Sequence, residues 1–359
     1  MLRRLFLCMM IVLILSLSVF ASETEDALTE GIDPQAGLPE EAVDEIGSYD
    51  DFSVSSFTDA LLRLLSDTLS GLGGSVKEGV ACCGAILAAV LLCGITESSE
   101  HAEKVSRMVG ALAITAICTG SISSMISLGT QTVRKINDYG LLLLPGMSTL
   151  AIASGASSTG TVLFFVSSLF FKLLMSLTEF LIVPGIGILT AISAAEAALG
   201  NEKLTKLRQF IQWMLTGLLK GILYVFTGFL ALTGVISGSC DAVRLKAAKL
   251  ALSGTVPVVG GILSDASETL LTSASVLRNT VGTYGLLAVL AICLYPFARV
   301  FLQYLLLKAV TALSGLLGQK QHVTLLESLT SAMGLTAGTV GTFGMMMLIS
   351  LTLFIKLAG

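Results

Sequence analysis

The chain has 359 residues, of which 54% are hydrophobic and 13% are charged, and its mean hydropathy is +0.88. Soluble domains carry about 25% charged residues, so this composition excludes an ordinary water-soluble protein. The formal net charge of −4 is unevenly placed, because 12 of the 25 acidic residues lie between Glu23 and Asp59. Basic residues outnumber acidic ones from residue 61 onward, so the embedded part of the chain is not acidic.

Residues 1–21 have the three parts of a cleavable signal peptide. Two arginines at positions 3 and 4 precede an apolar core that ends near Leu17, and small residues lead to a cleavage position after Ala21. Cleavage there places the new N-terminus outside the cytoplasm. The alternative is an uncleaved anchor, because a core of this length nearly spans a thin bilayer.

Residues 22–51 form an acidic segment with scattered Gly and Pro and few large apolar residues. Such a composition predicts a flexible extracytoplasmic spacer, in preference to a partner-docking tail. Residues 52–78 then show apolar residues at helical spacing, from Phe57 to Leu69, with Gly71 as the expected stop. This pattern predicts an amphipathic helix on the outer face of the membrane.

Residues 79–359 are expected to form an all-α, polytopic transmembrane helical bundle with about seven crossings, one more or fewer. The expected crossings are 79–96, 108–133, two or three within 139–199, 214–240, one within 281–317, and 333–358. Arg134, Lys135 and Asp138 are expected to close the second crossing. Small and polar residues at 146–160 favour a broken or re-entrant element, so 139–199 fits either two crossings with a re-entrant piece or three short crossings.

Two basic stretches, 201–208 and 241–249, flank one predicted crossing, and the positive-inside tendency therefore leaves the orientation open. In the first stretch Lys203, Lys206 and Arg208 are expected to face lipid headgroups, with Trp213 as an interface anchor. Three glycine pairs with GxxxG spacing allow close backbone approach, either within the bundle or between copies: Gly217/Gly221, Gly234/Gly238 and Gly334/Gly338.

Residues 254–278 combine an apolar stripe with an opposite polar stripe that includes Asp265 and Glu268. Such a helix belongs against a wet cavity or an interface. Pro257 and the pair Gly260-Gly261 keep the preceding turn open, which predicts a bent or re-entrant entry.

This region carries a pattern that resembles a known family. The pattern is Lys249, then Pro257-Val258-Val259-Gly260-Gly261, Leu263-Ser264-Asp265-Ala266, Leu277-Arg278-Asn279, Val281-Gly282 and Gly285. With the layout of a signal, an acidic lead and a polytopic body, it resembles the stage III sporulation protein AE family. Arg278 stands where that pattern has Lys, which keeps the charge.

The resemblance implies a multi-pass protein of the mother-cell membrane that surrounds the forespore. It implies a permease-like or channel subunit of a transenvelope complex, with ring-forming and other membrane proteins of that complex as partners, which supports forespore activity and late gene expression. A membrane scaffold that anchors the ring proteins and conducts nothing is the alternative.

Ionisable residues inside apolar stretches are the candidate pathway residues, because a buried charge is expensive there. Lys172 and Glu179 share one helix face in a regular helix, where they either line a hydrophilic path or bridge to other helices. The alternative is that a helix ends near residue 172 and Lys172 snorkels. Lys220, Arg299 and Lys308 are expected near segment ends and to snorkel. Asp265 and Glu268 favour a hydrated wall over ion coupling. The candidate pathway or interface residues are therefore Lys172, Glu179, Lys249, Pro257, Gly260, Gly261, Asp265 and Glu268.

Enzymatic chemistry has little support in the sequence. His101 and His322 are expected in short loops without ligand-spaced companions, and the seven cysteines are mainly in apolar spans, where they fit as packing residues. Phosphate-loop, CxxC-pair and HExxH patterns are absent from the sequence, as is a basic stripe for nucleic acid. We therefore expect no enzyme activity, no cofactor, no metal and no nucleic-acid partner.

Overall fold

The computed structural model describes residues 35, 38–46, 57–95, 100–255, 259–317 and 320–356, and between 231 and 278 it describes only the helix backbone. Apart from short turns and ends, these residues are helical, which confirms the predicted all-α fold. The predicted signal peptide, residues 1–21, lies outside them. Of the acidic segment 22–51, the described part includes the short helix α3 (Glu40–Ile46), whose Ala42 and Ile46 are buried.

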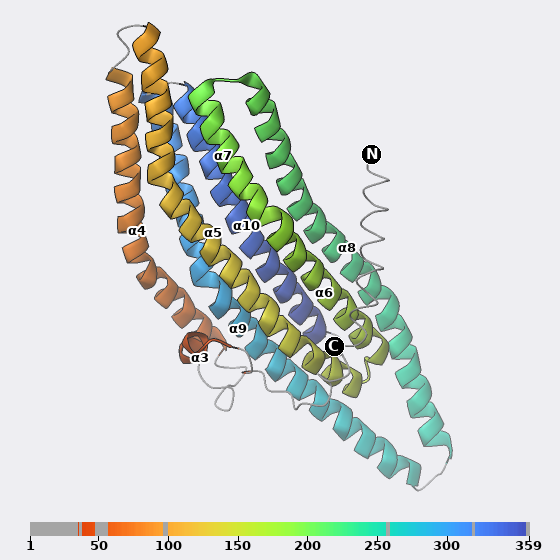
Figure 1. Ribbon diagram of the computed structural model, residues 1–359. Helices are drawn as coiled ribbons and strands as arrows, with labels where there is room; N and C mark the ends of the chain where they lie inside the picture. The colour runs from red at the N-terminus through yellow and green to blue at the C-terminus, as the bar shows by residue number, and fades with distance from the viewer. Residues whose placement is uncertain are drawn as a thin grey trace.

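Six long helical stretches run side by side, each antiparallel to the next along the chain (Figure 1). They are α4 (Phe57–Ile95), α5 (Glu100–Ala153), α6 (Ser157–Leu177) continued through the π-helix η3 (Thr178–Ile182) and α7 (Val183–Leu199), then α8 (Glu202–Thr255), α9 (Val259–Leu317) and α10 (Lys320–Lys356). By length and apolar composition, each contains a candidate membrane span. The described residues thus give six crossings, within the predicted range of about seven.

Helix α4 joins two segments that the sequence analysis separated. It continues through Gly71, so the predicted amphipathic helix and the predicted first crossing form one helix of 39 residues, about 58 Å long. A glycine weakens a helix interior by only about 1 kcal/mol, which packing against neighbouring helices offsets here. The stop predicted at Gly71 is therefore wrong.

Helix α5 likewise continues where a crossing was expected to close. It runs through Arg134, Lys135, Asp138 and Pro145 to Ala153. The chain then turns at Ser154 and Gly155, where Gly155 has φ 94° and the Ala156 N–H donates to the Ala151 carbonyl at 2.9 Å. Residues 146–160 therefore form the end of α5, a tight turn and the start of α6, and the prediction of a broken or re-entrant element there is wrong.

From Ser158 to Leu199 the chain makes one candidate crossing, not the predicted two or three. A π-turn at Thr178–Ile182 lies directly before Pro184, and the Val183 N–H donates to the Thr178 carbonyl across it. Proline has no N–H to complete the regular ladder, and a wider turn accommodates that loss without ending the helix. At the far end Gly200, with φ 65°, terminates α7 in the left-handed conformation.

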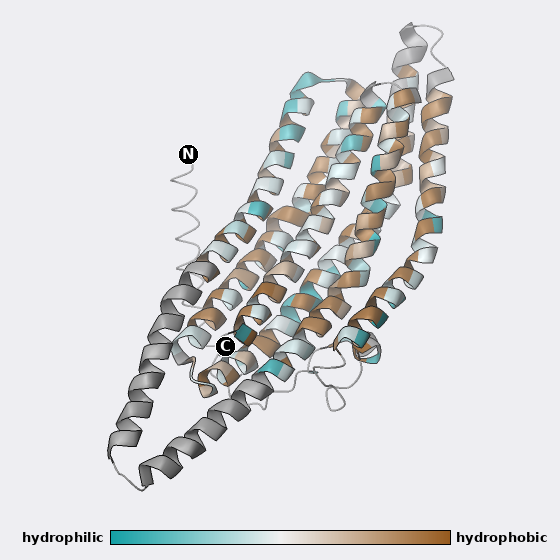
Figure 2. Ribbon diagram, turned by 180° about the vertical axis from the view of Figure 1, so that it is seen from behind, coloured by the Kyte–Doolittle hydropathy of each residue, from teal (hydrophilic) through white to brown (hydrophobic). Residues whose placement is uncertain are grey.

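The basic stretches that were expected as loops both lie within α8, which has 54 residues and a length of about 81 Å. A helix of this length exceeds the bilayer, so it holds both stretches on either side of its apolar part. Figure 2 shows the hydrophilic start of α8 at one end of the bundle. Helix α9 is continuous from Val259 to Leu317. Within the segment 254–278, which was predicted to enter as a bent or re-entrant element, the residues from Val259 onward therefore form the start of this long helix.

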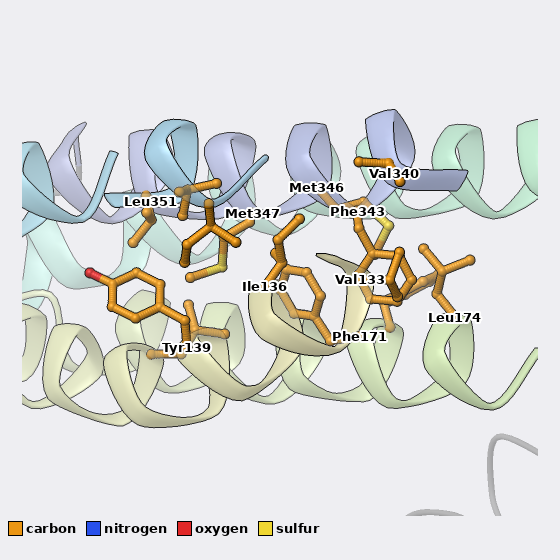
Figure 3. Close-up of a cluster of buried hydrophobic side chains, with 14 of the residues drawn as sticks. Val133, Ile136, Tyr139, Phe171, Leu174, Val340, Phe343, Met346, Met347 and Leu351 are labelled. Atoms are coloured by element: carbon orange, nitrogen blue, oxygen red, sulfur yellow. The ribbon is translucent and has the colours of Figure 1, made fainter. Parts of the chain in front are cut away.

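The core is centred on α10, which packs on α5, α7, α8 and α9. Figure 3 shows its buried contacts, with Phe343 facing Phe171 of α6 and Val133 of α5. The Phe171 and Phe343 rings lie 6.3 Å apart, and both are buried. In a hydrocarbon layer such close packing, more than transfer from water, holds helices together.

Buried hydroxyls in α10 are satisfied within the helix itself. Thr330, Thr336 and Thr339 each donate to the carbonyl four residues earlier, at 2.8 to 3.1 Å. Because these threonine hydroxyls bond to carbonyls of their own helix, they can be buried in the bundle without a water partner. The functional polar groups must therefore be sought elsewhere.

Gly160 offers a test of the α5–α6 hairpin. A Cβ at this position would lie 2.9 Å from the Ala151 Cβ, which is fixed to the backbone of α5 and cannot move aside. We expect Gly160→Ala to destabilise the folded protein by about 1–3 kcal/mol, measured as thermal unfolding in detergent.

Gly187→Ala is the matched control on the same helical stretch. A Cβ at Gly187 meets nothing within 4 Å, so this change should be neutral or slightly stabilising. Equal unfolding temperatures for the two variants would contradict the packing of this hairpin.

Candidate functional site

Charged side chains lie near the middle of several candidate spans. Glu78 lies on α4, Arg134 on α5, Glu179 on η3 and Arg299 on α9, each far from both ends of its span. The candidate span that holds Arg299 has 38 residues and is longer than a bilayer, so the expectation that Arg299 lies near the end of a crossing stays a prediction. Ionisable groups at such positions are costly in hydrocarbon, so they mark a water-lined surface or a protein interface and require a partner.

A groove of about 300 Å³ lies between α4, α5 and α9. Its polar lining residues are Ser75, Glu78, Ser121, Ser124, Arg299 and Gln303. Two glycines shape it. Gly79 lets α4 approach α9, because an added Cβ would meet the Leu306 and Gln303 side chains, while Gly120 faces open space. Small residues on α4 and α5 thus leave room for water or a solute beside the charged groups.

Arg299 and Glu78 form a long ion pair across this groove, in which Arg299 Nη2 donates to Glu78 Oε2. Arg299 Nη2 lies 3.5 Å from Glu78 Oε2, and the two side chains are 29% and 76% exposed. The Arg299 Nε is buried and has no hydrogen-bond partner among the described residues. A buried donor without a partner costs free energy, so Arg299 is held in this position by the packing around it.

Gln303, one turn after Arg299, is 7% exposed and is held in place from α5. Its Nε2 donates to Ser121 Oγ at 3.0 Å. The contact fixes the amide plane at the floor of the groove. A positioned amide and a guanidinium on successive turns of α9 form a rigid polar wall.

A polar stripe extends from the groove along the exposed face of α5. Its exposed members lie at helical spacing within one third of the helix circumference: Ser123, Ser124, Ser127, Gln131, Arg134, Lys135 and Asp138. The stripe is about 22 Å long, against a hydrocarbon thickness of about 30 Å. Such a surface belongs against water or another protein rather than lipid tails.

Glu179 closes this stripe from the neighbouring helix. Its Oε1 accepts from Arg134 Nε at 3.1 Å and lies 2.9 Å from Nη2. The Arg134 and Glu179 side chains are 58% and 35% exposed, so the pair lies on the outer face of the bundle.

A second ion pair is buried at the α7–α8 turn. Arg208 Nε donates to Glu196 Oε2 at 2.7 Å, and Thr205 Oγ1 donates to the other carboxylate oxygen at 2.8 Å. Both charged side chains are 9% exposed. The prediction that Arg208 faces headgroups is therefore wrong, because the tight turn at Gly200 folds it back onto α7. Trp213, in contrast, is 71% exposed, as an interface anchor requires.

The sequence-predicted residues are only partly brought together. Lys172 is exposed on α6, whereas Glu179 lies in the π-turn and pairs with Arg134. A regular helix was assumed, and the π-turn changes the register after Leu177. Pro257 lies outside the described residues, as do the side chains of Lys249, Asp265 and Glu268 and the surroundings of Gly260 and Gly261.

Sequence reasoning missed Arg134, Glu78, Gln303 and the Glu196–Arg208 pair. A signal existed for the pair, since Gly200 lies between Glu196 and Arg208 and a turn there brings the two residues together on antiparallel helices. His322 is also not in a loop, because it lies fully buried in the first turns of α10, and His101 lies in α5. No short-range pattern indicates the groove, because it forms where α9 packs against α4 and α5, which come much earlier in the chain.

The glycine pairs divide into two kinds. A Cβ on Gly334 would lie 3.2 Å from Tyr304, and one on Gly338 would lie 3.2 Å from Leu219, so this pair serves packing within the bundle. Gly217 and Gly221 on α8 meet nothing within 4 Å. Gly234 and Gly238 lie outside the residues whose surroundings are described.

Six antiparallel apolar helices with a polar groove near the middle of three of them define a multi-pass membrane protein. The chain matches the family described as Stage III sporulation protein AE over residues 44–358, and it belongs to that family. It is 22% identical over 280 residues to "Stage III sporulation protein AE" of Bacillus subtilis (strain 168), covering 76% of this chain and 70% of the relative. No solved structure matches the chain. The resemblance in residues 249–285 is thereby confirmed, and with it a role in sporulation.

The Glu196–Arg208 pair gives a stability prediction. Arg208→Met leaves the Glu196 carboxylate buried without its cation, and we expect a loss of about 3–5 kcal/mol, measured by unfolding in detergent. Replacing both residues, with Glu196→Leu added, should recover most of that loss because no unpaired charge remains.

Lys203→Met, at an exposed position of the same helix, is the control. Arg208→Met should lower the free energy of unfolding more than Lys203→Met does. If it does not, or if the double variant is as unstable as Arg208→Met alone, the buried ion pair does not hold α7 against α8.

Proposed function

We propose that this protein is a permease-like or channel subunit of the transenvelope complex that links mother cell and forespore, and that the α4–α5–α9 groove lies on its path. Its place is the mother-cell membrane around the forespore, where it supports forespore activity and late gene expression. The observation that carries this proposal is the groove itself, with Arg299 and Gln303 in the middle of an apolar helix. A protein that only anchors others has no need of such groups there.

The arrangement of the helix ends supports a role between two membranes. With six crossings, α3 and the end of α10 lie at the same end of the bundle, where α8 also meets α9 (Figure 1). If the signal is cleaved after Ala21, that end is extracytoplasmic. The family pattern of residues 249–285 then faces the ring-forming partners, and Lys203 and Lys206 lie on the cytoplasmic side.

A non-conducting scaffold is the second candidate, and one observation favours it. Gly217 and Gly221 on α8 leave an open helix face on which another transmembrane helix can pack closely. A scaffold depends on such faces and tolerates neutral replacements in the groove.

Neutral substitutions in the groove distinguish the two functions. We expect Arg299→Gln and Glu78→Gln each to lower heat-resistant spore yield and late forespore reporter activity by at least about tenfold, because each removes a charge the path requires. Asp265→Asn, Glu268→Gln, Lys172→Met and Glu179→Gln are measured in parallel. Each variant must show a normal membrane level and normal complex assembly.

Lys308→Gln is the matched control, because Lys308 is also on α9 but rests over the Tyr304 ring, 5.5 Å from its centroid, outside the groove. Full sporulation by every assembled groove variant would leave the scaffold as the function.

Topology gives an independent prediction. Alkaline phosphatase fused after Lys356 should be active, and a fluorescent protein at the same place dark, because the C-terminal end of α10 is extracytoplasmic in this proposal. The opposite result would place the α8–α9 connection in the cytoplasm and exclude ring contacts there.

A further inference from the structure

We propose that the α4–α5–α9 groove binds a small zwitterionic solute, with its acid group against Arg299 and its ammonium group against Glu78. This inference names a substrate class for the site of the proposed function, and to that extent rests on it. It is carried by the state of the charges in the groove, by the groove's size and by its place in the bundle.

The charges in the groove differ from those of the other described ion pairs. Glu196 and Arg208 are 2.7 Å apart and share a threonine, and Arg134 and Glu179 are 2.9 Å apart with two nitrogens on one oxygen. In the groove the nearest approach is 3.5 Å. The first two pairs are short, whereas Arg299 and Glu78 meet through one long contact of 3.5 Å beside the groove, where the largely exposed Glu78 is accessible to a ligand.

A zwitterion matches this arrangement better than a singly charged solute. An anion alone would meet the Glu78 carboxylate beside Arg299, and a cation alone would meet the guanidinium. An α-amino acid carries its ammonium and carboxylate groups on the same carbon, so it can contact both residues without leaving either unpaired. Ser124 and Ser75 supply hydroxyls to the remaining polar atoms of the solute.

The size of the groove limits the solute. Its volume of about 300 Å³ is at the lower end for ligand pockets, which suits a single amino acid and is small for a nucleotide. Ile117 and Met125 form the apolar part of the lining, against which a short side chain can lie.

Cys82 provides a native reporter, because it lines the groove and is partly exposed, whereas the neighbouring Cys83 is buried. The full chain is placed in nanodiscs of phosphatidylglycerol, which contain no zwitterionic lipid. Alkylation of Cys82 by N-ethylmaleimide is followed by mass spectrometry, with Cys83 as internal reference. The probes are L-alanine, propionate and ethylammonium, which share a skeleton and differ in charge.

We expect L-alanine to protect Cys82 at a concentration at least about tenfold below that needed with propionate or ethylammonium, since two charge-assisted contacts form instead of one. Arg299→Gln and Glu78→Gln should each weaken alanine protection by about tenfold or more, while Lys308→Gln should leave it unchanged. Isothermal titration of the same samples checks that protection reports binding.

Three results would overturn the inference. If propionate protects Cys82 as well as L-alanine does, the groove binds anions and does not require a zwitterion. If none of the three probes protects Cys82, the groove does not bind a zwitterion. Protection by added phosphatidylethanolamine but not by alanine would assign it to a lipid headgroup. If these results appear while Arg299→Gln still abolishes sporulation, only the solute class fails; if alanine binds but all groove variants sporulate, only the proposed transport function fails.

Discussion

Every polar group in the apolar part of this bundle must find a partner within the protein, and the rest of the structure follows from that constraint. Backbone groups meet it by forming helices without interruption, through Gly71, Pro145 and the π-turn before Pro184. Threonines on α10 meet it by donating to their own helix. Several charged groups meet it in ion pairs, and one of these pairs, Arg299 with Glu78, lines the groove.

The described ion pairs serve different purposes because their surroundings differ. Glu196 and Arg208 are buried and saturated, so they join two helices at a turn. Arg134 and Glu179 are exposed and close together, and they extend the polar stripe of α5 across the bundle surface. Glu78 and Arg299 are open to a groove bounded by glycines, which is the arrangement a ligand requires. The distance between the charged groups and their burial therefore distinguish the buried structural pair from the pair beside the groove.

The proposed path and the family pattern occupy different parts of the fold. The groove lies between α4, α5 and α9, whereas residues 249–285 lie where α8 meets α9 and continue into the apolar part of α9. Helix α9 therefore connects the two, with Arg299 and Gln303 on turns that follow the pattern. A subunit of this kind can contact ring-forming partners at one end of α9 and hold a solute near its middle.

The sequence by itself determined that this is an all-α multi-pass membrane protein of a sporulation family, because hydropathy acts over each segment separately and residues 249–285 form a local pattern. It did not determine helix ends, because packing kept α4 and α5 helical through Gly71 and Arg134, where local signals predicted breaks. It placed Glu179 in an apolar stretch, as a residue that lines a path or bridges to another helix, but it did not identify Arg134 as the partner or the π-helix that carries Glu179. Arg299, Glu78 and Gln303 became a site only in the tertiary structure, because α9 packs against α4 and α5, which lie far from it in the sequence.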